Sequence, residues 1–100
     1  MADTKKAILI GNDREMSDPI KLVLHRRRIE IVETATGREG LETMRRVKPD
    51  LVLLDLMLPD MDGWELYQQI KTDPELKDTP VIVITGKAQG IDDILGLHIL

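Results

Sequence analysis

A run of four apolar residues, 51–54, ends directly in a carboxylate, Asp55. Unbroken apolar runs of this length, bounded by charged residues, are typical of a strand buried on both faces of a parallel sheet. In open α/β sheets, ligands bind at the carboxyl ends of the strands. Pro59 and Gly63 then indicate a loop, and Asp62 can cap the helix that follows. The segment therefore predicts an acidic side chain held on rigid support at the mouth of a sheet.

Other apolar runs alternate with segments of helical periodicity along the chain. Asp18-Pro19 predicts the start of the first helix, because Asp is a favoured cap and Pro suits the first turn. Thr36 and Glu39 have the spacing of a capping box. The expected strands are residues 7–10, 29–34, 51–54 and 80–84, and the expected helices are residues 18–28, 36–48, 64–71 and from 91 onward. A strand–helix pattern repeated four times predicts an α/β fold with a parallel, doubly wound sheet.

Length and composition narrow the classes of protein. The 100 residues show no internal repeat and no linker, so we expect one domain over residues 1–100. The absence of Cys excludes disulfides and thiolate chemistry, and the net charge of -4 argues against a nucleic-acid surface on this domain. No apolar run approaches membrane-spanning length, and the N-terminus lacks an apolar signal core. We therefore expect no membrane contact and a cytoplasmic location.

Polar residues follow three of the predicted strands. Asn12 and Asp13 come after the first strand, Asp55 after the third and Thr85 after the fourth. In a flavodoxin-like strand order the first and third strands are neighbours, at the switch point where ligands bind. Two carboxylates there repel each other unless a cation joins them, and Mg²⁺ prefers carboxylate and other oxygen ligands. An Asp held in this way can serve as a nucleophile that forms an aspartyl phosphate.

The chain resembles the receiver domain of bacterial two-component response regulators from Lys6 to Leu100. The resemblance rests on an ordered set of residues: Asn12-Asp13, Asp55, Pro59 with Met61-Asp62-Gly63, and Thr85-Gly86. It implies a flavodoxin-like receiver fold, similar to that of chemotaxis regulators, with strand order 2-1-3-4. In this family a fifth strand and a fifth helix normally follow.

The resemblance also implies a Mg²⁺-dependent phosphoacceptor. Asp55 would accept a phosphoryl group from the phosphohistidine of a histidine kinase or phosphotransfer protein, and the domain would then switch its interactions with an output partner. Asp13, Asp55 and the backbone carbonyl of Met57 would hold the ion, with Asn12 as a candidate ligand through a water molecule. Such a domain assists its own phosphotransfer and is not a turnover enzyme.

Further roles follow from the same resemblance. The hydroxyl of Thr85 would hydrogen-bond the phosphoryl group and act as the switch, and Gly86 would leave room for the incoming group. Pro59 and Gly63 would shape the loop of the active site.

The chain departs from the family pattern in two respects. Asn12 stands where the family usually has a second acid, which removes one negative charge from the site. The sequence ends at Leu100, before the fifth strand, the Lys at its end and the fifth helix, and Lys87 lies in the wrong loop to replace that Lys. We therefore expect a C-terminally truncated receiver in which residues 81–84 form an exposed edge strand; the chain would either self-associate through that edge or be a fragment of a longer product.

Two other functions remain open. A phosphorylation-independent interaction or oligomerisation module would keep the fold without the complete set of family residues, and Asn12 favours it. An Asp-nucleophile phosphohydrolase needs a second acid two residues after the nucleophile, where this chain has Met57. A P-loop NTPase is excluded, because no G-x-x-x-x-G-K-[ST] motif is present.

Overall fold

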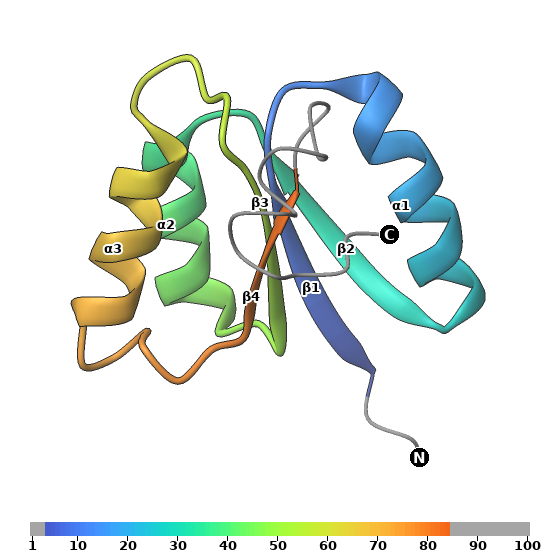
Figure 1. Ribbon diagram of the computed structural model, residues 1–100. Helices are drawn as coiled ribbons and strands as arrows, with labels where there is room; N and C mark the ends of the chain where they lie inside the picture. The colour runs from blue at the N-terminus through green and yellow to red at the C-terminus, as the bar shows by residue number, and fades with distance from the viewer. Residues whose placement is uncertain (1–3, 85–100) are drawn as a thin grey trace.

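The fold is an open α/β sheet with helices on both faces (Figure 1). The structure is a computed structural model that describes residues 4–84. Its elements alternate along the chain: β1 (Lys5–Ile10), α1 (Arg14–Arg26), β2 (Ile29–Thr34), α2 (Gly37–Val47), β3 (Leu51–Asp55), α3 (Gly63–Thr72) and β4 (Val81–Ile84). The helix expected from residue 91 onward lies outside the described residues. No helix of the described part is both long and apolar enough to cross a membrane.

The four strands form one parallel sheet in the order β2-β1-β3-β4. The predicted strand order, 2-1-3-4, is therefore confirmed. β1 and β3 are neighbours at the centre, with Ile8 paired to Val52 and Ile10 paired to Leu54. All strand carboxyl ends lie at one edge of the sheet, towards the top of Figure 1. Within residues 4–84, β4 pairs with β3 alone; self-association through its free side stays a prediction.

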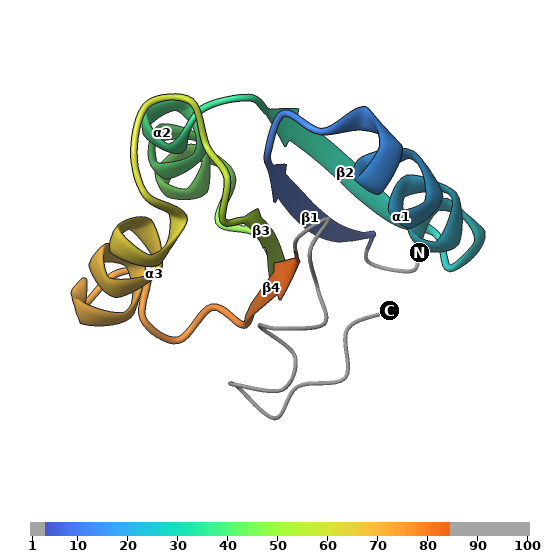
Figure 2. The same cartoon turned by 45° about the horizontal axis from the view of Figure 1, so that its top comes forward.

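Within residues 4–84, the helices cover the two faces of the sheet unequally. α2 and α3 lie on one face and α1 lies on the other (Figure 2). The face under α2 and α3 holds the larger cluster of buried apolar side chains: Ile8, Ile10, Met44, Val52, Leu54, Leu66, Ile70 and Leu76. The face under α1 holds a smaller cluster: Ala7, Leu9, Leu24, Leu53 and Ile84. Alternate residues of the same strands thus supply both cores.

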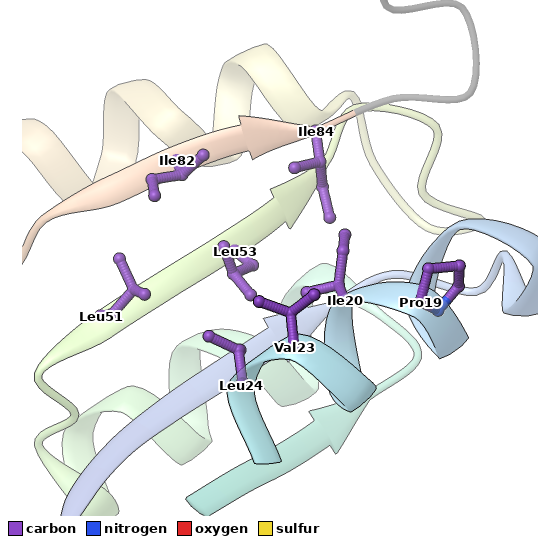
Figure 3. A pocket seen from close by; sticks show the side chains of 8 residues that line it. All are labelled: Pro19, Ile20, Val23, Leu24, Leu51, Leu53, Ile82 and Ile84. Atoms are coloured by element: carbon purple, nitrogen blue, oxygen red, sulfur yellow. The ribbon is translucent and has the colours of Figure 1, made fainter. Parts of the chain in front are cut away.

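An apolar pocket of about 210 Å³ lies on the α1 face, between α1 and the strands β3 and β4 (Figure 3). Pro19, Ile20, Val23 and Leu24 of α1 line one side, and the strands supply the other side with Leu51, Leu53, Ile82 and Ile84. Val23 and Ile82 remain 43% and 42% exposed. The α1 face is therefore less completely packed than the α2 and α3 face.

The predicted start of the first helix was wrong. α1 begins at Arg14, and its cap is Asp13, whose Oδ1 accepts the backbone N–H of Glu15 at 3.0 Å. Asp18 instead lies within the helix and pairs with Lys21 at 3.2 Å. Pro19 is the sixth residue of α1, so its missing N–H costs the helix the hydrogen bond to the carbonyl of Glu15. The helix starts early because the acid at the end of β1 caps it as soon as the chain turns.

The remaining helix boundaries agree with the predictions. The hydroxyl of Thr36 accepts the N–H of Glu39 at 3.1 Å at the start of α2, and Asp62 caps α3. α1 ends within the predicted run of arginines, where Arg28 adopts a left-handed conformation (φ 60°). Lys48 (φ 53°) ends α2 in the same way. These two turns bring the chain back to the amino-terminal edge of the sheet.

Candidate functional site

Asp55 is the last residue of β3 and is almost completely buried, with 3% of its surface exposed. Its Cα pairs with that of Ile84 at the end of β4. Its Oδ1 accepts the backbone N–H of Met57 at 2.9 Å, which fixes the carboxylate against the loop that follows. The predicted strand-end acid therefore lies in the sheet, at the carboxyl ends of the two strands.

The turn after β1 passes very close to Asp55. A Cβ on Gly11 would lie 2.7 Å from the Cβ of Asp55 and 3.3 Å from its Oδ2, so a side chain at this position would collide with the acid. The N–H of Gly11 donates to the carbonyl of Thr34 at 2.9 Å and holds the turn to β2. Asn12 and Asp13 follow with exposed side chains. Gly11 thus allows the turn that carries both residues to approach Asp55.

The electrostatic environment disfavours a charge on Asp55. Burial raises the pKa of this carboxyl above its ordinary value, and the negative charge of Asp13 raises it further. The backbone N–H groups of Met57 and Asn12 donate to the carboxylate and partly oppose that shift in pKa. Within residues 4–84, no ion pair joins either Asp13 or Asp55 to a basic side chain.

Backbone contacts between its two ends close the loop between β3 and α3. Met57 and Asp62 form an isolated antiparallel bridge, and the N–H of Gly63 donates to the carbonyl of Leu56 at 3.1 Å. A Cβ on Gly63 would lie 2.4 Å from the Cα of Leu56, so only glycine permits this approach. Pro59 lies exposed in the same loop. The bridge holds the backbone of Met57 beside Asp55.

The tip of this loop contacts the start of α2. Asp60 accepts the backbone N–H of Gly37 at 2.8 Å and that of Arg38 at 3.1 Å. The N–H of Gly37 is the main cause of a lowered pKa for Asp60, and that of Arg38 acts in the same direction. Sequence reasoning did not identify Asp60, because its partners lie 22 and 23 residues away.

The site opens to solvent through shallow hollows rather than a deep cavity. A hollow of about 620 Å³ is lined by residues of the two loops: Asn12, Leu56, Met57, Leu58, Pro59, Met61 and Asp62. A second, of about 280 Å³, lies beside Asp13 on the β1–α1 turn. The hollows open beside Met57 and Asp13, at the carboxyl edge of the sheet that also holds Asp55.

The oxygen donors at this edge suit a hard cation. Across the described range, no three His, Asp or Glu side chains form a metal cluster. The available donors are two carboxylates, on Asp13 and Asp55, and backbone carbonyl oxygens, which is the mixture that Mg²⁺ accepts together with water. Burial and the negative charge of Asp13 both raise the pKa of Asp55, so a cation held there would favour its ionised form.

Most of the predicted site residues come together. Asn12, Asp13, Asp55 and Met57 converge at the carboxyl edge of the sheet, and Pro59 and Gly63 belong to the adjoining loop. Thr85 and Gly86 lie outside the described residues, although β4 ends at Ile84 beside Asp55. Gly11 was missed as a site residue; a glycine between a buried strand and two polar residues was the available signal.

Known proteins with similar sequences are transcriptional regulators. The transcriptional regulatory protein AfsQ1 of Streptomyces coelicolor is 34% identical over 91 residues, which are 91% of this chain and 39% of AfsQ1. The DNA-binding response regulator MtrA of Mycobacterium tuberculosis is 29% identical over 94% of this chain and 40% of MtrA. The chain therefore spans about two fifths of the length of these relatives.

Solved structures with the same fold are receiver domains of response regulators. The N-terminal domain of a response regulator receiver protein from Methanoculleus marisnigri is 32% identical, with a TM-score of 0.78 over 94% of this chain and 78% of that one. The phosphorylated cyanobacterial phytochrome response regulator RcpA is 31% identical, with a TM-score of 0.71 over 92% of this chain and 72% of RcpA.

The family model for the response regulator receiver domain matches residues 7–97, which is most of the chain. Receiver domains of two-component systems are signalling domains rather than turnover enzymes; they interact with histidine kinases and generally bind Mg²⁺ for phosphorylation. The fold, the strand order and the acids at the carboxyl edge agree with that match. This chain belongs to the response regulator receiver domain family.

Proposed function

We propose that this domain is a phosphoacceptor and that Asp55 receives the phosphoryl group from a histidine kinase. One observation carries the proposal: Asp55 is 3% exposed at the sheet edge, beside Asp13 and without a cationic partner among the described residues. A structural acid buried to this extent would be paired with a cation so that its charge is stabilised in the fold. The N–H groups of Met57 and Asn12 only partly offset the rise in the pKa of Asp55, so a bound cation would stabilise its charge further.

The reaction requires an ionised Asp55. One oxygen of its carboxylate would attack the phosphorus of phosphohistidine, form a new O–P bond and displace the imidazole nitrogen, which leaves with the electron pair of the P–N bond. The N–H of Met57 donates to Oδ1 and that of Asn12 also donates to the carboxylate, so both would hold the attacking group in place. The added charge, of about -1.5 to -2, would then change which surfaces of the domain its output partner binds.

Asp13, Asp55 and the backbone carbonyl of Met57 would hold Mg²⁺, with Asn12 contributing through a water molecule. When bound, the ion neutralises charge on the phosphoryl oxygens and aligns them with the acceptor. Oδ1 of Asp13 already accepts the N–H of Glu15, so Oδ2 is the oxygen that would bind the ion. The resemblance assigns the switch hydrogen bond to Thr85 and the open space beside it to Gly86.

A second function is favoured by a specific observation. Asn12 supplies a neutral oxygen where the family usually has an acid, which weakens the attraction for a cation. A phosphorylation-independent interaction module would need the fold and its surfaces but no ionised Asp55. The two functions differ in whether the chain takes up phosphate at all.

Intact-mass analysis after incubation with acetyl phosphate and Mg²⁺ tests the proposal. We expect one phosphate-sized adduct on the wild-type chain, and none on Asp55→Asn or when the ion is chelated. Asp13→Asn is the matched variant, because Asn also caps helices well and therefore leaves α1 in place. We expect that variant to need a higher Mg²⁺ concentration for the same adduct. No adduct on a folded wild-type chain would reject the phosphoacceptor function and favour the interaction module.

A further inference from the structure

Asp60 uses both carboxylate oxygens to hold the start of another element. Oδ1 accepts the N–H of Gly37 at 2.8 Å and Oδ2 accepts that of Arg38 at 3.1 Å. Gly37 and Arg38 are the first two residues of α2, where backbone N–H groups have no partner inside the helix. The negative charge also lies at the positive end of the helix dipole. Asp60 therefore binds α2 as a distant second cap, in addition to Thr36.

A second contact joins the same two segments. Met61 lies against Gly37 so closely that a Cβ on this glycine would be 2.6 Å from the sulfur atom. Met61 also packs on the buried apolar cluster under α2 and α3. A polar contact and an apolar contact from adjacent residues thus fix the tip of the loop on the helix.

A short stretch of backbone connects the tip of this loop to Asp55. The bridge between Met57 and Asp62 closes the loop, so Asp60 lies inside a short ring of backbone. Met57 is the residue whose N–H donates to Asp55 at 2.9 Å. If Asp60 released α2, the loop would still be closed by the Met57–Asp62 bridge and by the hydrogen bond from Gly63 to Leu56. Asp60 therefore supplies the described hydrogen bonds that tie this closed loop, and Met57 with it, to α2.

We infer that Asp60 is a positioning residue for the acceptor site: it anchors the loop to α2 and thereby sets the Met57 backbone beside Asp55. This inference rests on the proposed function in so far as the Met57 backbone serves phosphotransfer. A simpler role, in which Asp60 only stabilises α2, makes a different prediction. In that case any loss of capping at this helix would have the same effect as the loss of Asp60.

The matched control for this distinction is Thr36→Ala. Thr36 caps the same helix through the N–H of Glu39 and has no described hydrogen bond to the loop. Both Thr36→Ala and Asp60→Ala should lower the melting temperature, by roughly 5 °C for a lost cap in a domain of this size. Asp60→Asn should be intermediate, since its amide keeps one oxygen as an acceptor and loses the charge.

Two measurements separate the roles. Amide hydrogen exchange by NMR, without any phosphate donor, should show faster exchange at Gly37, Arg38 and Met57 in Asp60→Ala, and no change at Met57 in Thr36→Ala. The initial rate of phosphorylation by acetyl phosphate at saturating Mg²⁺ should fall roughly tenfold to a hundredfold in Asp60→Ala, as misplacement of a reacting group requires. Thr36→Ala should keep the wild-type rate.

Equal slowing of phosphorylation in Asp60→Ala and Thr36→Ala would overturn the inference, because helix stability alone would then explain both. Unchanged exchange at Met57 in Asp60→Ala would overturn it as well. If Asp60→Ala does not fold, Asp60→Asn decides the same comparison. If the wild-type chain takes up no phosphate, the proposed function fails, and the exchange at Met57 still decides whether Asp60 positions the loop.

Discussion

The two faces of the sheet are packed to different degrees, although the same strands build both. Under α2 and α3, seven large apolar side chains lie fully buried. Under α1, Val23 and Ile82 remain more than 40% exposed and a pocket of about 210 Å³ separates the helix from β3 and β4 (Figure 3). Of the helices described within residues 4–84, α2 and α3 cover the first face and α1 covers the second (Figure 2).

This difference shows that the amino-acid composition of a strand does not reveal how completely helices cover each face of the sheet. Val52 and Leu54 of β3 point to the well-packed face, and Leu51 and Leu53 point to the other. All four are apolar, as expected for a strand in a parallel sheet. By the same alternation Asp55 continues the row of Leu51 and Leu53, so the proposed acceptor belongs to the less packed face.

The largest expected effect comes from truncating a side chain on the well-packed face. Ile70→Ala should lower the free energy of unfolding by about 2–5 kcal/mol, because the fully buried site cannot collapse around the lost atoms. Val23→Ala, on the other face, should cost less than about 1 kcal/mol. Urea unfolding measures both. Similar losses for the two variants would mean that the α1 face is as tightly packed in solution as the other.

Enlarging a side chain, instead of truncating it, also tests the difference in packing between the two faces of the sheet. Gly40 lies inside α2, where Ala usually stabilises a helix by about 1 kcal/mol. Here a Cβ would lie 2.5 Å from Cδ1 of Ile10, so Gly40→Ala should be destabilising by about 1–3 kcal/mol despite the gain in helix propensity. Val23→Leu adds a methylene beside the pocket and should be nearly neutral. Thermal unfolding monitored by circular dichroism compares them; a stabilised Gly40→Ala would contradict the assignment of a well-packed face.

The smallest expected effect concerns the dependence of stability on pH. Because burial and Asp13 raise the pKa of Asp55 in the folded state, its ionisation opposes folding. Below the pKa of Asp in the unfolded chain, about 3.9, Asp55 is protonated in both states and folding bears no ionisation cost. The free energy of unfolding then falls as the pH rises through the higher pKa of Asp55 in the folded state. Asp55→Asn should therefore be more stable than the wild type at pH 7, and the difference should vanish near pH 3.

Urea unfolding across this pH range, with and without Mg²⁺, provides the measurement. Added Mg²⁺ should reduce the difference at pH 7, because an ion bound by the wild-type carboxylates stabilises the folded state by mass action. A pH-independent difference between the two proteins would show that ionisation of Asp55 is not the cause.

Local sequence signals predicted the strands and the strand-end acids well. The apolar run that ends in Asp55 and the turn at Asn12-Asp13 needed no knowledge of distant residues. The start of α1 was wrong because two cap signals compete within six residues, and the Pro at residue 19 made the later one look stronger. Residue propensity could not decide between the two caps, Asp13 and Asp18. Asp13 caps the helix because this residue lies in the turn that follows β1.

The contacts that assemble the site could not be predicted locally. Gly11 matters because it touches Asp55, which lies 44 residues further along the chain, and Asp60 matters because it holds the N-terminus of α2. Both depend on how the elements pack in space. A single sequence contains the residues but not the distances between them.

The double use of Asp13 has a consequence for how this family can change during evolution. One of its oxygens starts α1, and the other is the oxygen proposed for the cation. Asn and Ser are equally good helix caps, so either residue at position 13 would keep the helix and remove the charge. Selection for a folded chain therefore does not protect the chemistry at this position. A lineage can weaken its proposed binding of Mg²⁺ by one substitution and still inherit an intact scaffold for binding partners.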